Sequence, residues 1–210
     1  MKTLSLAVFS LLLLSGFAHD ASAGYGKKAA ACSYSADPKD IQLTWTAFKF
    51  TTKAAVKGHF NKAPVSGTAS AKSLAGLMQN LQMDIDAASV ETDNPARNAT
   101  IQQFFFEKFA PASKIHAATS KVVGDDAKGT ATIRITMNGV TRAVPFAYTT
   151  TPEGTVEAKG SIDLLNFNLK SAFDSLHEAC KDKHVGPDGV AKTWTQVDLL
   201  LTGKFKKECS

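Results

Sequence analysis

The sequence lacks the local signatures of the common enzyme classes. It contains no Gly-x-Ser-x-Gly nucleophile elbow, no glycine-rich phosphate loop and no His-Glu-x-x-His zinc motif. Four histidines follow the first 23 residues, and no serine or cysteine forms an evident catalytic pair with them in sequence: His59, His116, His177 and His184. We therefore expect a protein that is not an enzyme. A triad assembled in space stays open, because triad members occur in any order along a chain.

Long apolar runs are also scarce. The only one spans residues 4–14, which is shorter than the roughly 20 apolar residues that a bilayer-crossing helix needs. Lys2 precedes this run, and Ala21-Ser22-Ala23 follow it as a small-residue cleavage site, so we interpret residues 1–23 as a secretory signal peptide cleaved after Ala23. A buried N-terminal helix is the less favoured alternative.

The 187 residues that would remain (210 minus 23) contain neither an internal repeat nor a low-complexity linker. This length suits one well-buried domain and is short for two. Residues 24–32 are small and basic and show no periodicity, so we expect a disordered lead there. The domain itself is expected over residues 33–210.

Charge of one sign is not concentrated anywhere. The net charge of +5 comes from scattered lysines, without the basic stripe or the aromatic-basic groove that nucleic-acid binding needs. We expect no nucleic-acid partner. A modest positive charge instead suits transient contact with an anionic membrane surface, where each nearby lysine contributes on the order of 1 kcal/mol.

Alternating apolar residues dominate the rest of the chain. Ile41, Leu43, Trp45 and Ala47 share one face of a strand, and the phase slips by one before Phe48, which suggests a bulge. Asn138-Gly139 lies between two β-type runs and predicts a tight hairpin. Further strands are expected at 56–60, 65–71, 77–90, 114–123, 130–137, 142–149, 155–164 and 193–205. Such spacing predicts an antiparallel sandwich or barrel.

Two segments break the β pattern. Asp93 or Asn94 can cap a helix that has Pro95 in its first turn and runs to about Phe106. Apolar residues at helical spacing predict a second helix over about 166–183, before a Gly-Pro-Asp-Gly turn. Helices inserted into a small barrel usually cap its mouth, so we expect both helices near a ligand entrance.

Aromatic and aliphatic residues of these elements form a candidate pocket. Four phenylalanines within six positions, 104–106 and 109, are too costly to leave in water. The predicted pocket set is Trp45, Phe48, Phe60, Leu81, Ile85, Phe104, Phe105, Phe109, Met137, Val144, Phe146, Phe167, Phe173 and Leu176. A barrel core filled by these side chains is the alternative, since barrels of about eight strands are just wide enough to fill or to hold one ligand.

The chain resembles the YceI-like family. The resemblance rests on four blocks in the family's order within Ser33 to Lys207: TWTAFKFTTKAAVKGHF, ASVETDNPAR, MNGVTRAVPF and TWTQVDLLLTGKF. It implies an all-β, antiparallel, lipocalin-like β-barrel of about eight strands with one or two short helices at its mouth. Family members often carry Arg-Asp where this chain has Arg97-Asn98, so a polar role of that aspartate is not carried over.

The resemblance also implies a function. It points to a secreted or periplasmic protein that holds a polyisoprenoid, fatty acid or fatty amide in an elongated apolar cavity for transport or storage. Arg97 and His184 are the residues that we expect to meet a polar head group. A filled barrel that binds a protein partner and a lipid-modifying enzyme that uses the histidines stay as alternatives. Pairing into a homodimer is left open.

No cofactor is expected. His177, Cys180 and His184 fall at i, i+3 and i+7, which suits soft metal ligands on one helix side, yet no fourth ligand is evident. Asp84 and Asp86 share a strand face without a calcium-binding loop around them. We expect no metal site at either place.

Three cysteines follow the expected signal peptide, so one is left over from any single bridge. Cys32 precedes the first expected strand and Cys209 follows the last, and these ends are neighbours in a closed antiparallel barrel. We predict a disulfide between them, with Cys180 buried along the apolar stripe of its helix. A bridge from Cys180 to either terminus remains the alternative.

Overall fold

The computed structural model describes residues 31–109 and 114–210. The expected signal peptide and residues 24–30 of the expected lead lie outside this part of the chain. Strand β1 (Cys32–Ala36) begins at Cys32, one residue before the domain boundary that we expected. Among the described residues, no helix is both long and apolar enough to cross a membrane.

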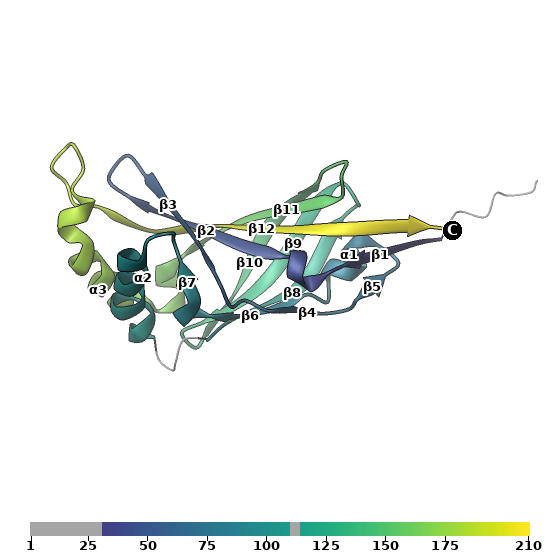
Figure 1. Ribbon diagram of the computed structural model, residues 1–210, viewed down its shortest axis with the longest axis horizontal. Coiled ribbons are helices and arrows are strands. Elements are labelled where there is room, and N and C mark those ends of the chain that lie inside the picture. Colours follow the sequence, from purple (N-terminus) through teal and green to yellow (C-terminus); the bar gives the residue numbers. More distant parts are fainter. Residues whose placement is uncertain (1–30, 110–113) are drawn as a thin grey trace, which may run out of the picture.

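One antiparallel sheet forms the body of the protein (Figure 1). Its hydrogen-bonded order is β4-β6-β8-β9-β10-β11-β12-β2-β3-β7, and β1 pairs with β12 and β5 beside this path. The strands of the path are β2 (Gln42–Lys49), β3 (Ala54–Phe60), β4 (Val65–Ser66), β6 (Gln82–Asp86), β7 (Val90–Glu91), β8 (Lys114–Gly124), β9 (Lys128–Met137), β10 (Val140–Thr150), β11 (Thr155–Asp163) and β12 (Thr193–Cys209); β5 is Ser70–Ala71.

The two edges of this sheet meet. β3 pairs with β7, and β4, which follows β3 in the chain, pairs with β6, which precedes β7. Between these pairs, the Asn61 amide donates to the Ser89 carbonyl and the Asp86 amide donates to the Lys62 carbonyl, both at 2.9 Å. β3 and β4 are therefore two parts of one interrupted strand, and so are β6 and β7. Counted in this way, eight strands among the described residues form the closed wall of the barrel. The prediction of an antiparallel barrel of about eight strands is confirmed.

The predicted hairpin is confirmed as well. Met137 of β9 pairs with Val140 of β10, so the connection has two residues. Asn138 and Gly139 both adopt positive φ angles, 51° and 75°, which only such residues tolerate easily. This turn sets the register of the two strands over ten residue pairs, from Val140 with Met137 to Thr149 with Lys128.

Two expectations about the strands were wrong. Residues 77–90 do not form one strand, because helix α1 (Leu74–Met78) precedes β6 and the 3-10 turn η2 (Ala87–Ser89) interrupts the run. The Ser73 hydroxyl caps α1 by accepting from the Gly76 amide at 3.0 Å. The segment 65–71 likewise contains two separate two-residue strands.

The bulge expected after Ala47 was also misplaced. β2 pairs with β3 without interruption from Thr44 to Lys49. The register between β2 and β12 shifts instead on the β12 side, between Thr193 and Val197. Because β2 continues its alternation, Phe48 lies on the face opposite to Trp45 and Ala47.

Both predicted helices lie together at one end of the barrel (Figure 1). α2 (Pro95–Phe104) begins as predicted, with the Asn94 side chain accepting from the Arg97 amide at 2.9 Å and Pro95 in the first turn. The 3-10 turn η3 (Phe106–Lys108) follows it. α3 (Lys170–Cys180) is shorter than predicted, because Asn168 has a positive φ of 55° and 3-10 turns flank the helix at η4 (Leu164–Phe167) and η5 (Lys181–His184).

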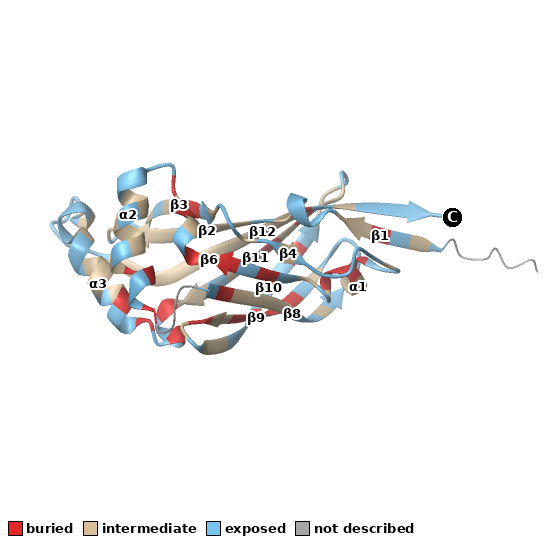
Figure 2. Ribbon diagram, turned by 60° about the horizontal axis from the view of Figure 1, so that its bottom comes forward, coloured by how far each residue is buried: buried red, intermediate tan, exposed pale blue. Residues whose placement is uncertain are grey.

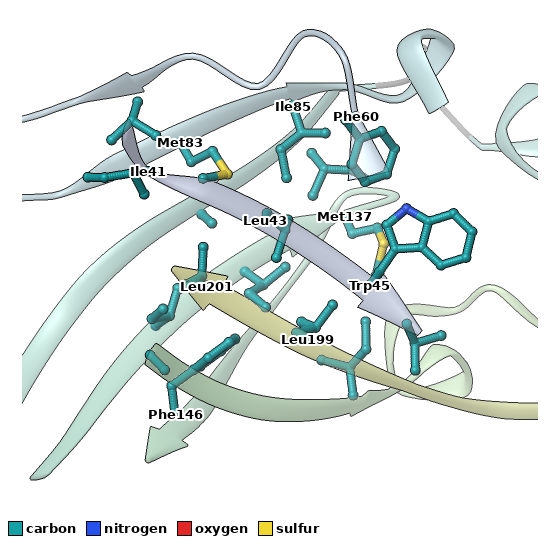
Figure 3. A pocket seen from close by; sticks show the side chains of 18 of the residues that line it. Ile41, Leu43, Trp45, Phe60, Met83, Ile85, Met137, Phe146, Leu199 and Leu201 are labelled. Carbon is teal, nitrogen blue, oxygen red and sulfur yellow. The ribbon is translucent and has the colours of Figure 1, made fainter. Parts of the chain in front are cut away.

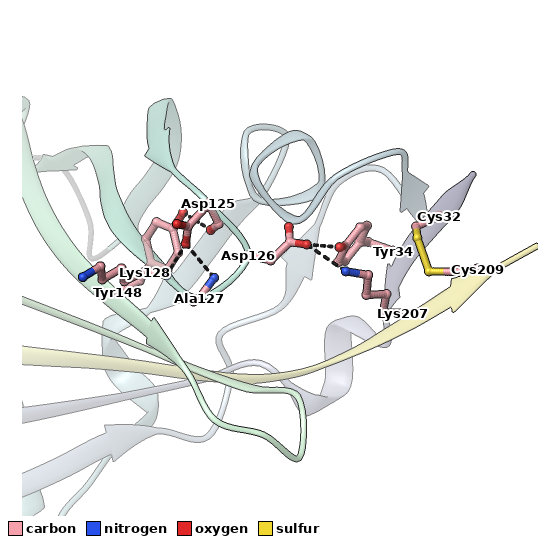
Figure 4. A network of polar contacts seen from close by, with 9 residues as sticks. All are labelled: Cys32, Tyr34, Asp125, Asp126, Ala127, Lys128, Tyr148, Lys207 and Cys209. Carbon is pink, nitrogen blue, oxygen red and sulfur yellow. Dashed lines mark hydrogen bonds and ion pairs between the residues drawn. A yellow bond between two sulfur atoms is a disulfide. The ribbon is translucent and has the colours of Figure 1, made fainter. Parts of the chain in front are cut away.

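The opposite end is held by covalent and polar contacts (Figure 4). Cys32 of β1 and Cys209 of β12 form the predicted disulfide across directly paired positions. The buried Tyr34 donates its hydroxyl hydrogen bond to the Asp126 carboxylate, which also receives Lys207 Nζ at 3.0 Å. Tyr34 holds the pKa of Asp126 below its ordinary value, with Lys207 as a second cause. The last residues of β12 are exposed there (Figure 2).

Candidate ligand cavity

A cavity of about 230 Å³ lies inside the barrel, so the side chains of the wall do not fill it (Figure 3). Its lining comes from all eight strands of the wall, from α2 and α3 at one end and from α1. The lining residues are Ile41, Leu43, Trp45, Ala47, Phe60, Val65, Met78, Leu81, Gln82, Met83, Ile85, Ile101, Phe105, Phe106, Ile115, Ala117, Thr119, Ala131, Ile133, Ile135, Met137, Phe146, Val156, Ala158, Ile162, Leu164, Leu176, Val197, Leu199, Leu201, Thr202, Gly203 and Phe205.

Strand alternation places most of these side chains. Leu43, Trp45 and Ala47 of β2 pair directly with Leu201, Leu199 and Val197 of β12, and all six residues line the cavity. Paired residues on neighbouring strands point to the same side of a sheet, so this face is continuous across the wall. Figure 3 shows Leu43, Trp45, Leu199 and Leu201 along this part of the interior.

A cluster of aromatic rings lies at the α2–α3 end of the cavity. Phe105 packs edge-on against Phe106 and Phe109, with ring centroids 5.1 and 5.3 Å apart, and Phe106 packs in the same way against Phe60 of β3 at 5.9 Å. Ile101 of α2 and Leu176 of α3 complete this end of the lining. Offset edge-to-face pairs of this kind add about 0.5–1.5 kcal/mol each beyond burial.

The lining is almost free of polar groups. None of its residues is charged, and the polar ones are Gln82, Thr119 and Thr202 besides the indole of Trp45. Gln82 is exposed, and Gln82 and Thr202 fall on the alternate parity to their lining neighbours Met83 and Leu201. Among the lining residues, alternation therefore brings only Thr119 and the indole of Trp45 to the inner face with a polar group. Burying an isolated charge in such surroundings is very costly, so the cavity suits an uncharged apolar chain.

The cavity brings together half of the predicted site residues. Those that line it are Trp45, Phe60, Leu81, Ile85, Phe105, Met137, Phe146 and Leu176. The others lie outside the lining: Phe48, Arg97, Phe104, Phe109, Val144, Phe167, Phe173 and His184. Three of these are buried core residues that do not line the cavity: Phe109, Val144 and Phe167, with exposed fractions of 9%, 6% and 1%. Phe104 is half-buried at the end of α2.

Phe48 and Phe173 have other neighbours. Phe48 is on the outward face of β2, where Lys53 Nζ lies 5.6 Å from its ring centroid. Phe173 stacks on His177 of the same helix, with centroids 6.3 Å apart. Phe48 therefore packs on the outside of the barrel wall, because β2 continues without the expected bulge. Phe173 is half-buried and packs against the core from α3, on the face that periodicity predicted, but it does not line the cavity.

Arg97 supports the start of α2 rather than the cavity. Its Nε donates to the Thr92 hydroxyl at 3.0 Å, and Nη2 donates to the Thr92 carbonyl at 3.3 Å. Asn98 joins the same network by donating to Glu91 at 2.8 Å and accepting from the Thr92 hydroxyl at 2.6 Å. The Asn98 hydrogen bond is the main cause that lowers the pKa of Glu91. The ASVETDNPAR block, one of the four that carry the resemblance, thus forms a hydrogen-bond network at the start of α2.

His184 lies outside the cavity, beside the start of β12. His184 and His177 place their Nδ1 atoms 2.7 and 2.9 Å from the hydroxyl oxygen of Thr193. Burial lowers the pKa of His184, and Lys49 and His177 lower it further. Cys180 is the last residue of α3, and burial raises the pKa of its thiol. Among the described residues, no group of three or more histidine, cysteine or acidic side chains is arranged to hold a metal ion.

Sequence reasoning missed much of the β-strand lining. Leu43 and the inward residues of β12, Val197, Leu199 and Leu201, were within predicted strands but were not assigned to the pocket. Alternation in Ile41 to Ala47 already marked Leu43 as sharing a face with Trp45. Phe106 was part of the aromatic group and was also left out, although it lines the cavity between Phe60 and Phe105.

Comparison with known sequences identifies the family. The sequence profile of the YceI-like domain matches residues 34–192. The chain belongs to the YceI-like family. No curated protein sequence matches the chain.

Solved YceI-like structures share the fold. A polyisoprenoid-binding domain from Saccharophagus degradans, implicated in plant cell wall breakdown, superposes with a TM-score of 0.55 at 17% identity, covering 84% of this chain and 98% of that one. Burkholderia cenocepacia BcnA gives 0.54 at 16% identity, with 81% and 99% covered. The Campylobacter jejuni YceI protein gives 0.51 at 21% identity, with 77% and 90% covered. These similarities establish a common YceI-like barrel.

Proposed function

We propose that the protein binds one long-chain amphiphile, an isoprenoid or fatty chain, in the barrel cavity and carries or stores it. The observation that supports this most directly is the cavity itself, which is lined by apolar side chains and has no charged residue in its lining. The name of the Saccharophagus degradans structure, a polyisoprenoid binding domain, points to the same ligand class.

The physical chemistry of such a site favours exchange at membranes. Each buried methylene contributes about 0.8 kcal/mol against water, so a long chain is held tightly in solution. A bilayer offers the chain an equally apolar environment, so that gain nearly vanishes in contact with a membrane. The net positive charge of +5 would help the protein meet an anionic surface. Selectivity then depends on the length and shape of the cavity.

The proposed setting is outside the cytoplasm. A signal peptide cleaved after Ala23 would deliver the chain to the periplasm or the exterior. The disulfide between Cys32 and Cys209 fits an oxidising compartment of that kind. We propose a binding protein rather than an enzyme, with Trp45, Phe60, Phe105, Phe146 and the other lining residues as its contacts.

Native mass spectrometry tests this proposal directly. Protein isolated from its own host should carry one lipid per chain, which organic extraction releases for identification. Two variants of neighbouring β8 residues sharpen the test. Ala117→Phe fills the cavity from its inner face, whereas Ala118→Phe adds the same ring on the alternate face.

The Ala117→Phe protein should stay folded and lose the lipid, because the cavity has room for the added ring. The Ala118→Phe protein should retain the lipid. An empty wild-type protein, or equal lipid content in both variants, would contradict the proposal.

A further inference from the structure

Trp45 carries the most informative polar atom of the cavity. The residue lines the cavity and is 8% exposed, and its Nε1 is buried without a hydrogen-bond partner among the described residues. Buried N–H groups in folded proteins are nearly always paired, because an unpaired donor costs about 1–3 kcal/mol. An unpaired donor on a cavity wall therefore points to a partner that arrives from the cavity.

The barrel holds this indole in place. Trp45 pairs with Gly58 of β3 on one side and with Leu199 of β12 on the other. A Cβ atom on Gly58 would lie 2.2 Å from Cζ2 of the indole, so the ring lies over the glycine backbone and occupies the space that a side chain would take. Figure 3 shows the indole with its nitrogen on the side that faces Phe60. Its N–H direction is thus fixed by packing rather than by a polar contact.

We propose that Trp45 Nε1 donates a hydrogen bond to an uncharged oxygen acceptor of the bound lipid, a carbonyl or hydroxyl oxygen. This inference rests on the proposed function and names the chemistry of the ligand. A neutral acceptor satisfies the donor without bringing a charge into a lining that has no charged residue to neutralise it. A carboxylate or phosphate group would have to lie outside this part of the cavity.

The proposal also places the polar part of the ligand. Trp45 shares the α2–α3 end of the cavity with Phe60 and Phe106, and the rest of the chain would extend along the inner face of β2 and β12 towards Ile41. Thr119 is the competing anchor, because its hydroxyl is on the inner face of β8. If Trp45 is the anchor, removing its N–H weakens binding of the polar ligand, whereas removing the Thr119 hydroxyl does not. If Thr119 is the anchor, the reverse holds.

The test uses two ligands and three proteins. A long-chain methyl ketone is compared with the hydrocarbon in which a methylene replaces the carbonyl, in wild type, Trp45→Phe and Thr119→Val. Trp45→Phe also removes volume, which weakens the binding of both ligands alike. The ratio of the ketone affinity to the hydrocarbon affinity therefore reports the contribution of the indole N–H alone. We expect that ratio to fall about twofold to tenfold in Trp45→Phe, the range of one neutral hydrogen bond, and to be unchanged in Thr119→Val.

Indole N–H resonances provide an independent readout. The chain has two tryptophans, and Trp194 Nε1 already donates to the Phe50 carbonyl at 2.7 Å and lies outside the cavity lining. On ketone binding the Trp45 N–H proton should move downfield, with a smaller change for the hydrocarbon. The Trp194 signal should stay in place with both ligands.

The outcomes separate the two hypotheses. If neither ligand binds, the proposed lipid-binding function fails. If both bind while the affinity ratio is the same in wild type and Trp45→Phe and the Trp45 signal does not respond to the ketone, the inference about Trp45 is wrong and lipid binding stands. A ratio that falls only in Thr119→Val would place the polar group at β8 instead.

Discussion

The two ends of this barrel are held by different kinds of interaction. At the β1 end, the disulfide joins the first and last strands, and Tyr34, Asp126 and Lys207 cross-link them to the β8–β9 turn. At the α2–α3 end, phenylalanine rings pack against each other and form part of the cavity lining. Covalent and charged contacts fix the strands without taking up cavity space, whereas the aromatic contacts are shared between core and cavity.

This difference separates stability from binding in a testable way. Substitutions at the β1 end should change the free energy of unfolding and leave the cavity intact. Substitutions at the α2–α3 end should change both, because the same rings serve both purposes.

Removing the disulfide should have the largest effect on stability. Cys32 and Cys209 are separated by 177 residues, so the bridge closes nearly the whole domain into one loop. Loop-closure entropy for so long a loop corresponds to about 5 kcal/mol. The Cys32→Ser/Cys209→Ser protein should therefore unfold at much lower urea concentration while retaining ligand at temperatures where it is folded.

Cys180→Ser is the matched control for this measurement. Cys180 is a free, partly buried thiol, and burial raises its pKa, so it should react slowly with alkylating agents. Its replacement should shift the urea midpoint far less than loss of the bridge. Non-reducing peptide mapping must recover Cys32 linked to Cys209; a dominant bridge that contains Cys180 would contradict the assignment.

Phe105 tests the aromatic end. Phe105→Ala removes a ring that is 6% exposed, contacts Phe106 and Phe109 and lines the cavity, and should cost about 3–5 kcal/mol. Phe105→Trp adds bulk in the same place and should shorten the cavity. We expect the tryptophan variant to stay folded and to lose long-chain ligands before short ones, measured by ligand titration alongside unfolding midpoints taken without ligand.

Phe104→Ala gives the comparison for both variants. Phe104 is half-buried and outside the lining, so its truncation should have a smaller effect on stability and none on chain-length preference. If the Phe105 variants bind all chain lengths as wild type does, the ring is ordinary core, and the aromatic contacts at the α2–α3 end contribute to stability alone.

Parts of the fold that depend on local chemistry could be predicted from the sequence. The hairpin at Asn138-Gly139, a helix capped by Asp93 or Asn94 and the Cys32–Cys209 pairing follow from local chemistry or chain order. The structure confirms all three, with Asn94 as the cap. The resemblance to the YceI-like family implied the number of strands in the barrel, about eight. The ends of interrupted strands, such as β6 and β7, could not be predicted, because apolar residues continue through the turn between them.

Cavity residues were harder to predict than the fold. Phe48 and Trp45 are both aromatic and three positions apart, yet they lie on opposite faces because β2 runs without a bulge. Burial alone does not separate a cavity wall from a filled core, since Phe105 and Phe109 are similarly buried and only Phe105 lines the cavity. That distinction depends on tertiary packing, which no local pattern records.

Tyr34→Phe sharpens the comparison from the β1 end. The Tyr34 hydroxyl bonds to Asp126, whose carboxyl is about half exposed, so its loss should cost less than about 1 kcal/mol. The pKa of Asp126 is lowered from 3.8, chiefly by Tyr34, so this contribution is present above pH 3.8 and is lost as the pH falls through the lower folded value. Wild type and variant should therefore converge in urea midpoint at acidic pH, with lipid content equal throughout.

The smallest expected effect concerns pH at the α2–α3 end. His184 is partly buried beside Thr193 and His177, and burial lowers its pKa from 6.5, with Lys49, His177 and Lys183 lowering it further. The unfolded chain therefore takes up a proton at higher pH than the folded chain, and the stability that neutral His184 contributes above pH 6.5 is lost as the pH falls through the depressed folded value.

Urea midpoints measured at neutral and mildly acidic pH should decline less in His184→Gln than in wild type, whereas the same change at the exposed His59 should leave the decline as it is. Because the group lies outside the cavity lining, ligand affinity at neutral pH should be equal in all three proteins. A decline of the same size in His184→Gln and wild type would mean that protonation of His184 does not couple to folding. The acid sensitivity would then belong to other groups, such as the carboxylates with lowered pKa values, Glu91 and Asp126.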